Sequence, residues 1–542
     1  MKTLLRGVNA KYIHPSVSLY QLKANTTYES TILEFTIKQP IENMVTTIYN
    51  HLKDQEIKLI SFSCYLWNIE IILILVKLIK EKFPNIYIVL GGPEVAYDAK
   101  HFLESNKKID YIITGEGEDS FHELCLLIDN KISINEVSNL AYLYDDRYIT
   151  TFQAQPDLSK IKLATLDVED IENRIVYLES GRGCPYKCSY CTASLDNKVR
   201  FFPLEKVLEI VRILMQKQIK TVKFLDRTFN ANMKYMMQIL DIIDNENICT
   251  TFQFEIVVEK LNQEVINRIA NMKTKCLRFE IGIQSTNDLV NEAVCRRQNM
   301  DILEKNIALL QATNKVDLHV DLIAGLPLET KESFINSFNR VFKYRAKELQ
   351  LGFLKFLRGT SLMNDIKEHE FAYDENPPYE IISNKYMTQK DLDEIRLVEN
   401  SLELYSNSSK FTHTFNYLFE HSLINNPYDF FLKLSSNIKH SQLYELFIHI
   451  DDFFLKNFPS DYEELHFKLI QDYLENHKTK PKIWWSYQIT KPYRKSLYEE
   501  IVSKLDISID DLYKHSIVYK NEKLNKIYII IYQNLNFKSY VL

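Results

Sequence analysis

The chain has 542 residues and a mass of 64.1 kDa, more than one hydrophobic core usually organises, which predicts three or four domains. With 66 basic and 72 acidic residues the formal charge is only −6, so composition gives no reason to expect a nucleic-acid partner. The longest apolar run, Ile69 to Ile79, contains Glu70 and Lys77 and is too short to cross a bilayer, and the first residues lack a signal-peptide pattern. We therefore expect a cytoplasmic protein without a membrane partner.

Residues 1–150, called the front domain below, alternate short apolar runs with helical patterns. Strands are predicted at Thr3–Val8, Lys58–Cys64, Ile86–Leu90 and Tyr111–Thr114, and helices near 41–53, 68–82 and 119–128. This alternation is typical of an α/β fold with a parallel, doubly wound (Rossmann-like) sheet.

The carboxyl ends of these strands are candidate binding positions, because ligands of doubly wound sheets bind there. The sequence places polar side chains and glycines at those ends, namely Asn9, Ser61, Ser63, Gly91, Gly92, Gly115, Glu116 and Gly117. Glycine lets a flat or bulky ligand approach the backbone closely. The alternative is that these glycines only make tight turns between strand and helix.

A second α/β domain is predicted at 174–373, after a linker at 151–173 that contains Gln153, Gln155 and Pro156. Its strand-like runs, each separated from the next by a helical pattern, are Arg174–Leu178, Thr221–Leu225, Thr251–Ile256, Leu277–Ile283, Val316–Ile323 and Leu349–Phe356. Six strand–helix repeats predict a partial (β/α)6 barrel with its active site at the carboxyl ends of the strands.

Three of the eight cysteines follow the first barrel strand with the spacing C-x3-C-x2-C: Cys184, Cys188 and Cys191. Three thiolates on one tight loop can hold three corners of a 4Fe-4S cluster and leave the fourth iron open to a cofactor. The alternatives are a zinc site, which would ordinarily need four protein ligands, a ferredoxin-like cluster, which uses four cysteines, and a chance grouping of buried thiols. The other five cysteines occur singly in apolar or helical patterns and are interpreted as small buried hydrophobes.

Polar residues also end the later barrel strands. Alternation along the fourth strand places Glu280, Gly282 and Gln284 on one face, and inside a barrel such a row is a site candidate. Outside a barrel the same row would be a solvated face. Asp226 ends the second strand, where a helix N-cap is the competing interpretation.

Four segments together resemble the radical S-adenosylmethionine (SAM) superfamily: the cysteine loop with Tyr190 before its last cysteine, Phe224–Asn230, Arg278–Ser285 and Asp321–Thr330. The resemblance implies that the open iron chelates SAM and that one electron cleaves SAM to a 5′-deoxyadenosyl radical. It also implies the SAM contacts, which are Tyr190, Asp226 at the methionyl ammonium, Glu280, Gln284 and Ser285 at the ribose and carboxylate, and Asp321, Gly325 and Leu326 near the adenine.

The front domain resembles the cobalamin-binding domain of one subgroup of that superfamily, through Asn9–Ser16, Gly91–Pro93 and Thr114–Glu118. The resemblance makes the eight strand-end residues named above candidate cobalamin contacts. The D-x-H-x-x-G motif that supplies a cobalt-binding histidine in other cobalamin proteins is not present in this sequence. His14, which precedes Pro15, is interpreted as a helix-entry or packing residue.

Residues 374–542 are predicted to form a mainly α-helical domain with a terminal hairpin near 517–532. The segment around Tyr405–Phe411 resembles an uncharacterised domain that follows the radical core in one branch of the family. Lys355 and Arg358, at the end of the last barrel strand, are expected either to face a substrate or phosphate or to be ordinary rim charges. The remaining candidates are interpreted as packing or surface residues: His413, His421, His440, His449 and the pair Trp484–Trp485.

The combined resemblance implies a radical SAM enzyme. We expect it to use oxidoreductase-type chemistry for cobalamin-dependent methyl transfer to an unactivated carbon or phosphorus. The expected cofactors are a 4Fe-4S cluster, SAM and cobalamin, with flavodoxin or ferredoxin as electron donor. One alternative is an empty front domain and a radical oxidation, rearrangement or ring formation. A methylthiotransferase acting on RNA would need a second cysteine trio in the front domain, which has only Cys64 and Cys125. The last alternative is a purely structural or electron-carrying protein, and no motif identifies the substrate.

Overall fold

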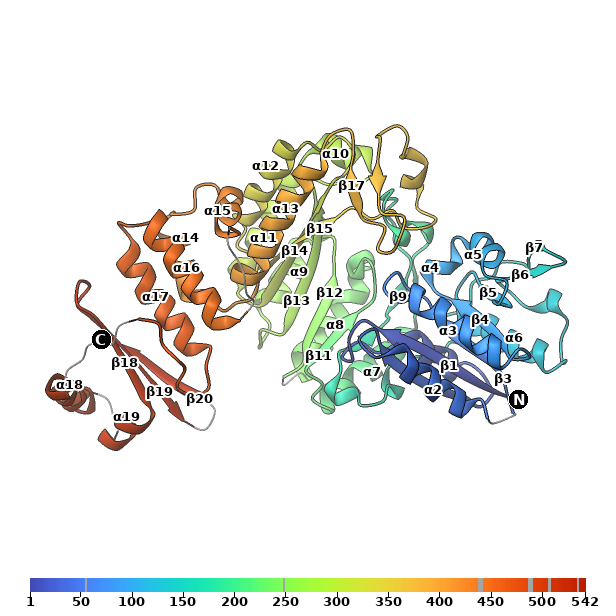
Figure 1. Cartoon of the computed structure of the whole chain (residues 1–542), viewed down its shortest axis with the longest axis horizontal. Helices are drawn as coiled ribbons and strands as arrows, with labels where there is room; N and C mark the ends of the chain where they lie inside the picture. The colour runs from blue at the N-terminus through green and yellow to red at the C-terminus, as the bar shows by residue number, and fades with distance from the viewer. Residues whose placement is uncertain (54–55, 247–248, 437–441, 486–490, 505–507, 534–535) are drawn as a thin grey trace. The chain divides into compact units, whose positions relative to one another are not determined.

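The computed structural model describes residues 1–53, 56–246, 249–436, 442–485, 491–504, 508–533 and 536–542 (Figure 1). They form two compact units, one of Met1–Phe334 with Gly352–Gln389 and the other of Ile335–Leu351 with Lys390–Leu542. Among these residues no helix is both long enough and apolar enough to span a membrane.

A seven-stranded sheet in the order β2-β1-β3-β4-β5-β6-β7 organises the front domain. β1 to β5 pair in parallel, and β6 and β7 extend the edge as antiparallel strands. The bounds are β1 (Lys2–Asn9), β2 (Ser30–Thr36), β3 (Ile57–Ser63), β4 (Tyr87–Gly91), β5 (Tyr111–Ile113), β6 (Leu140–Tyr144) and β7 (Arg147–Thr150). β2, β6 and β7 were not predicted from the sequence.

Helices cover both faces of this sheet, because its strands bury side chains on both sides. Leu4 and Val8 of β1 enter one core and Leu5 enters the other, as strand alternation requires. The first core contains α2 (Ile41–His51), α3 (Ile69–Lys82), α4 (Pro93–Ala96) and α5 (Ala99–Ser105), and the second contains α1 (Val17–Ala24) and α6 (Gly117–Ile128). The predicted doubly wound fold is confirmed.

The barrel domain contains a six-stranded sheet in the order β8-β11-β12-β13-β14-β15. The neighbouring pairs from β8 to β14 are parallel. The strands are β8 (Val176–Leu178), β11 (Thr221–Phe224), β12 (Thr251–Glu255), β13 (Leu277–Gln284), β14 (Val316–Ala324) and β15 (Glu348–Phe353). The helices are α7 (Leu204–Gln216), α8 (Met233–Glu246), α9 (Gln263–Ala270), α10 (Asp288–Ala293), α11 (Met300–Thr313) and α12 (Lys331–Phe342). Strands in sequential order with helices between them confirm the predicted partial barrel.

Two short antiparallel ribbons complete this unit. β9 (Gly181–Arg182) pairs with β10 (Arg200–Phe201), and β16 (Ala372–Tyr373) pairs with β17 (Ile381–Ser383). The predicted linker folds back on the front domain, where Ala164 and Val168 form a small core with Tyr20 of α1. The division into compact units falls after Gln389, beyond the Pro377–Pro378 breakpoint that the sequence indicates.

The second unit is mainly helical, as predicted, with an aromatic core. Phe338 packs edge-on against Tyr428 and Phe431. Its helices are α13 (Gln389–Ser401), continued by a π-helical turn at Leu402–Asn407, then α14 (Thr412–Glu420), α15 (Pro427–Leu434), α16 (Leu443–Asn457), α17 (Tyr462–Glu475), α18 (Lys491–Lys504) and α19 (Ile509–His515). The predicted hairpin is part of a three-stranded sheet of β18 (Ser516–Asn521), β19 (Lys526–Gln533) and β20 (Asn536–Val541).

Candidate functional site

The three clustered cysteines lie on one closed loop at the carboxyl end of β8. The β9–β10 ribbon closes the base of this loop, and the Cys184 N–H donates to the carbonyl of Asp196 at 2.9 Å. Gly183 has φ +87°, and a Cβ there would lie 2.5 Å from the carbonyl oxygen of Lys198, so the tight entry to the loop requires glycine.

The cysteine loop borders a cavity of about 170 Å³ at the strand ends. Its lining includes Cys184, Cys188, Cys191, Tyr190, Arg227, Glu255, Glu280, Gly282, Gln284, Arg296 and Asp321. Within the described residues no group of three His, Cys, Asp or Glu side chains is arranged to hold a metal ion directly. The three thiols share the wall of one small cavity, where three cysteines could hold three corners of a 4Fe-4S cluster.

Two arginines of this cavity were not found from the sequence. Arg296 Nη1 lies 3.9 Å from Cys188 Sγ, and Arg296 Nη2 donates to the carbonyl of Gly282. Arg227 follows Asp226, and its Nη1 lies 3.6 Å from a carboxylate oxygen of Glu255. Both arginines line the cavity that the cysteine loop borders. Arg227 lies within Phe224–Asn230, one of the segments that carry the resemblance, but was not singled out there, and Arg296 lies in none of those segments.

The polar row on β13 faces the cavity as alternation predicted. Glu280 accepts from Lys223 Nζ at 2.9 Å and from Gln253 Nε2 at 2.8 Å. Burial by itself would raise the pKa of Glu280, but the Lys223 ammonium outweighs it and lowers that pKa. Burial raises the pKa of Asp321, although His319 Nε2 lies 3.0 Å away and acts in the opposite direction.

Gln284 is in a backbone conformation that aims its amide at the cavity. Its φ is +68°, and the register between β13 and β14 shifts between Gly282 and Gln284. Its Oε1 is buried and has no hydrogen-bond partner among the described residues. An orphaned buried acceptor costs free energy unless a ligand group donates to it, so it fits a hydroxyl or ammonium of a cofactor.

Four of the expected SAM contacts do not line this cavity. Asp226 is 4% exposed and accepts both from the backbone N–H and from the hydroxyl of Ser180. It does not cap a helix either, since the next 3-10 turn begins after Thr228. Burial raises the pKa of Asp226 to about 7 despite these hydrogen bonds.

The other three lie in the supporting wall. The Ser285 hydroxyl donates to buried Glu329 at 2.6 Å, the carbonyl of Gly325 accepts from Asn384 at 2.9 Å, and Leu326 is fully buried. In this structure the side chains or backbone groups of Asp226 and these three residues already have partners or are packed in the core.

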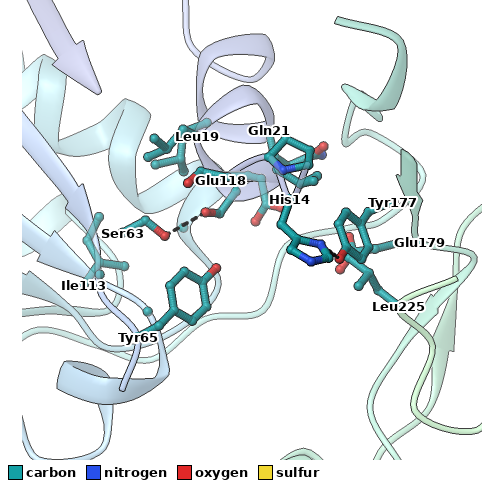
Figure 2. Close-up of a pocket in the computed structure, with 18 of the residues that line it drawn as sticks. His14, Leu19, Gln21, Ser63, Tyr65, Ile113, Glu118, Tyr177, Glu179 and Leu225 are labelled. Atoms are coloured by element: carbon teal, nitrogen blue, oxygen red, sulfur yellow. Dashed lines mark hydrogen bonds between the residues drawn. The ribbon is translucent and has the colours of Figure 1, made fainter. Parts of the chain in front are cut away.

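A larger cavity of about 750 Å³ lies where the strand ends of the front domain meet those of the barrel. Figure 2 shows Ser63 and Tyr65 on one side of it and Tyr177, Glu179 and Leu225 on the other. Seven of the eight candidate cobalamin residues line it, namely Asn9, Ser61, Ser63, Gly91, Gly92, Gly115 and Gly117. Glu116 does not, since it is bound to Arg182 and Arg200.

Gly91 and Gly92 line this cavity, and a side chain would have a different effect at each of the two positions. A Cβ on Gly91 would meet only Ile113, at 3.9 Å, so a side chain there would project into open space in the cavity. Gly92 has φ +109°, and a Cβ on it would lie 2.5 Å from the carbonyl of Cys64. Glycine at position 92 is therefore required by the tight turn between strand and helix, whereas glycine at position 91 leaves space for a ligand.

Three aromatic or imidazole side chains of the front domain also line the cavity. His14 Nδ1 pairs with the Tyr177 hydroxyl at 2.7 Å, and burial lowers the pKa of His14. Tyr65 and Trp67 stack with centroids 4.4 Å apart. The sequence did not single out this aromatic pair.

Arg358 is paired with acidic side chains of the front domain. It pairs with Asp98 at 2.5 Å and with Glu94 at 3.1 Å, and Tyr379 donates to the same Glu94. Lys355 forms an isolated β-bridge with Glu380.

In the second unit the histidines and tryptophans pair with neighbours inside the unit. His413 Nε2 lies 2.9 Å from Glu475, and His449 pairs with the Tyr405 hydroxyl. His421 pairs with the backbone carbonyl of Tyr417, Trp484 donates to Asp451, and Trp485 packs edge-on against Trp484. His440 lies outside the described residues.

Comparison with known proteins follows the same division of the chain. Residues 178–341 match the radical SAM superfamily, residues 6–125 the B12 binding domain, and residues 367–539 a family of proteins of unknown function, DUF4080.

Several curated relatives are named as methyltransferases, and others as anaerobic magnesium-protoporphyrin IX monomethyl ester cyclases or tRNA-2-methylthio-N(6)-dimethylallyladenosine synthases. An uncharacterised methyltransferase of Pyrococcus horikoshii is 24% identical over 52% of this chain and 62% of its own length. The cobalamin-dependent radical SAM methyltransferase TokK of Streptomyces tokunonensis is 25% identical over 51% of this chain and 43% of its own. The chain thus spans about half the length of these relatives.

The solved structure of the cobalamin-dependent SAM radical enzyme OxsB, with aqua-cobalamin and SAM bound, is similar in fold. Its TM-score is 0.61 at 13% identity, over 94% of this chain and 81% of OxsB. This protein is therefore an enzyme of the radical SAM superfamily that carries a B12-binding domain. More particularly, it is a member of the superfamily whose C-terminal part belongs to DUF4080.

The residues present fit the three cofactors of this class, a 4Fe-4S cluster, SAM and cobalamin. The three cysteines can hold the cluster, the unpartnered Gln284 oxygen and the two arginines suit SAM, and the open space beside Gly91 suits a bulky flat ligand.

Proposed function

We propose that this enzyme cleaves SAM reductively at a 4Fe-4S cluster held by Cys184, Cys188 and Cys191, and uses the radical for cobalamin-dependent methylation of an unactivated carbon or phosphorus centre. One electron, supplied by a donor such as flavodoxin or ferredoxin, breaks a carbon–sulfur bond of SAM to give methionine and a 5′-deoxyadenosyl radical, while cobalamin supplies the methyl group.

The observation that carries this proposal is a shared wall between the two cavities. Arg227 lines both the cysteine cavity and the large cavity of the front domain, and Gly183, next to Cys184, also lines the latter. A substrate positioned beside Arg227 would be within reach of both cofactors, which a radical methylation requires.

The chain's own residues have distinct tasks in this scheme. Arg227 and Arg296 place positive charge beside the thiolates and can hold the carboxylate of SAM. Glu280, fixed by Lys223 and Gln253, presents an ionised carboxylate to a hydroxyl or ammonium of a ligand. The Tyr177–His14 pair closes the other end of the large cavity.

Some relatives are named as methyltransferases, others as anaerobic magnesium-protoporphyrin IX monomethyl ester cyclases or tRNA methylthio synthases, so their names alone identify neither the reaction nor the substrate of this chain. If the front domain is an empty scaffold, the reaction is instead an oxidation, rearrangement or ring formation. Binding of corrinoid distinguishes these two functions.

The first experiment tests radical formation. Anaerobically reconstituted protein is reduced with dithionite and SAM, and 5′-deoxyadenosine is measured. Single changes of Cys184, Cys188 or Cys191 to Ala are expected to abolish both cluster iron and 5′-deoxyadenosine, whereas Cys249→Ala, at an exposed cysteine outside the loop, retains both. Cleavage that survives in the loop variants would refute the cluster assignment.

The second experiment tests methylation chemistry. Protein produced with hydroxocobalamin and purified anaerobically should retain about one corrinoid per chain, read from visible absorbance. Protein that retains none, yet still forms 5′-deoxyadenosine, would refute cobalamin-dependent methylation and favour the non-methylation reaction.

A further inference from the structure

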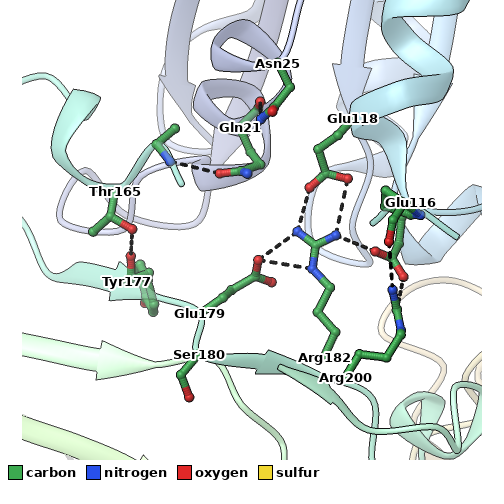
Figure 3. A network of polar contacts seen from close by, with 12 residues as sticks. Gln21, Asn25, Glu116, Glu118, Thr165, Tyr177, Glu179, Ser180, Arg182 and Arg200 are labelled. Atoms are coloured by element: carbon green, nitrogen blue, oxygen red, sulfur yellow. Dashed lines mark hydrogen bonds and ion pairs between the residues drawn. The ribbon is translucent and has the colours of Figure 1, made fainter. Parts of the chain in front are cut away.

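A set of ion pairs joins the strand-end loop of the front domain to the base of the cysteine loop (Figure 3). Arg182, two residues before Cys184, makes five hydrogen bonds to three carboxylates: Glu116 at 2.5 Å, Glu118 at 2.6 and 3.3 Å, and Glu179 at 2.8 and 3.2 Å. A guanidinium has five N–H donors, so all of them are used.

The network holds both strands at the base of the cysteine loop. Arg182 and Arg200 face each other in the β9–β10 ribbon. Glu116 binds Arg182 through one carboxylate oxygen and Arg200 through the other. The Glu116 carboxylate of the front domain therefore links the two ends of the segment that carries all three cysteines.

The same network also borders the large cavity. Glu118 and Arg182 line it together with Gly115 and Gly117, while Glu116 lies outside its lining. Glu118 and Arg182 are 5% and 13% exposed at their side chains, and such charge-assisted pairs are geometrically specific. A ligand that contacts this loop would touch groups that fix the cysteine loop.

We propose that Arg182 is a positioning residue that couples cobalamin binding in the front domain to SAM binding at the cluster. The proposal rests on the proposed function, because it requires both cofactors. A ligand that orders Gly115–Glu118 orders Arg182 and Arg200 through the two glutamates, and these set the position of the cysteine loop. Such coupling is reciprocal, so SAM must tighten cobalamin binding by the same factor by which cobalamin tightens SAM binding.

Arg358 provides a matched control. It too is an arginine of the barrel side that binds two front-domain carboxylates, Glu94 and Asp98. Among the described residues it forms no hydrogen bond or ion pair with the cysteine loop, and it does not line either cavity. If the ion pairs only hold the two domains together, Arg182→Gln and Arg358→Gln should act alike.

The test is equilibrium dialysis of hydroxocobalamin against the cluster-loaded full chain, with and without SAM, with the cluster oxidised so that SAM is not cleaved. In the wild type, SAM is expected to tighten hydroxocobalamin binding by a factor of about 5 to 150. In Arg182→Gln the factor should fall to about one with the iron content retained, and in Arg358→Gln it should stay at the wild-type value.

Glu116→Gln is the second variant, because it weakens both arginine contacts and leaves Arg182 in place should Arg182→Gln fail to fold. It too should lower the factor. An unchanged factor in Arg182→Gln or Glu116→Gln, or an equal loss in Arg358→Gln, overturns the proposal. Wild-type protein that binds hydroxocobalamin without any SAM effect overturns the coupling but not the methylation, whereas wild-type protein that binds no hydroxocobalamin overturns both.

Discussion

Ser180 and Asp226 are joined by two hydrogen bonds, one from the Ser180 backbone N–H at 2.9 Å and one from its hydroxyl at 2.5 Å. These bonds tie the end of β11 to the residue that precedes β9 and the cysteine loop. We therefore propose that Asp226 braces the cysteine loop, as an alternative to the SAM contact that the resemblance implies.

Asp226→Ala is expected to lower stability before it changes SAM affinity. Removing the carboxylate leaves the N–H and hydroxyl of Ser180 buried and unpaired, at a cost of about 1–3 kcal/mol. Thermal denaturation and SAM binding should be measured together. Asp241→Ala is the control, because Asp241 is a half-exposed partner of Arg268. This change should lower the free energy of unfolding by less than about 1 kcal/mol. Loss of SAM binding with unchanged unfolding would make Asp226 a SAM ligand after all.

The sequence predicts what depends on local periodicity. The placement of Glu280 in the cavity follows from the two-residue repeat of β13, whereas Gln284 reaches the cavity from a positive-φ conformation at a register shift. Ser285 comes just after the strand, where alternation ends, and its side chain turns to Glu329. A resemblance can locate a segment, but the direction of a side chain in a loop depends on contacts from elsewhere.

Arg296 is a residue of the cysteine cavity that could not be predicted from the sequence. It reaches Cys188 across 108 residues of sequence, from the segment between α10 and α11. No repeat or spacing in the chain encodes that approach, because it arises from the closing of the sheet. The edge strands β6 and β7 were missed for a related reason, since they pair antiparallel outside the strand–helix alternation from which the domain was predicted.

Gly91→Leu is expected to abolish corrinoid retention without unfolding the front domain. The new side chain would enter the open space beside Ile113 and fill part of the cavity, and no backbone strain arises because Gly91 does not have a positive φ. Visible absorbance after loading with hydroxocobalamin measures retention, and 5′-deoxyadenosine formation reports on the cluster.

Gly92→Ala is the contrasting variant. At φ +109° and with a Cβ 2.5 Å from the Cys64 carbonyl, it should destabilise the fold by about 1 kcal/mol or more and lower the denaturation temperature. A Gly91→Leu protein that retains a full complement of corrinoid would place cobalamin outside this cavity.

Arg6→Met is expected to stabilise the protein. Arg6 is fully buried among apolar residues of β1 and its neighbours, and its three guanidinium nitrogens have no hydrogen-bond partner among the described residues. The ring of Phe35 lies 5.7 Å away and offers only a weak cation–π contact. Burial lowers the pKa of Arg6 to about 9.

Because the folded-state pKa lies below the usual value, the cost of burying the charge is fully present at neutral pH, begins to fall only as pH rises above about 9, and is lost only as pH approaches the usual arginine pKa. Methionine should raise stability by about 1–3 kcal/mol, seen as a higher denaturation temperature. Arg212→Met, at a partly exposed pair with Glu246, should change it by less than about 0.5 kcal/mol. A less stable Arg6→Met protein would show that Arg6 has a bound partner, such as an anion, in solution.

Glu329→Gln is expected to change the pH dependence of stability. Glu329 is fully buried, its Oε1 accepts from the Ser285 hydroxyl at 2.6 Å, and its Oε2 has no partner among the described residues. Burial raises the pKa of Glu329 from 4.5 to about 8. An acid with a raised folded-state pKa stabilises the fold at low pH, and this contribution is lost as pH rises from about 4.5 to about 8, with a slope of up to about 1.4 kcal/mol per pH unit.

Glutamine keeps the acceptor for Ser285 and has no proton to lose, so the slope due to residue 329 should vanish. Thermal denaturation of both proteins at about pH 5 and about pH 8 measures this slope. The stability of Glu329→Gln relative to the wild type should be greater at about pH 8 than at about pH 5. Glu329→Ala leaves the Ser285 hydroxyl unpaired and should be less stable than Glu329→Gln at both pH values. If the difference between the wild type and Glu329→Gln is the same at both pH values, Glu329 keeps one protonation state across this range, and the buried neutral carboxyl behind Ser285 is ruled out.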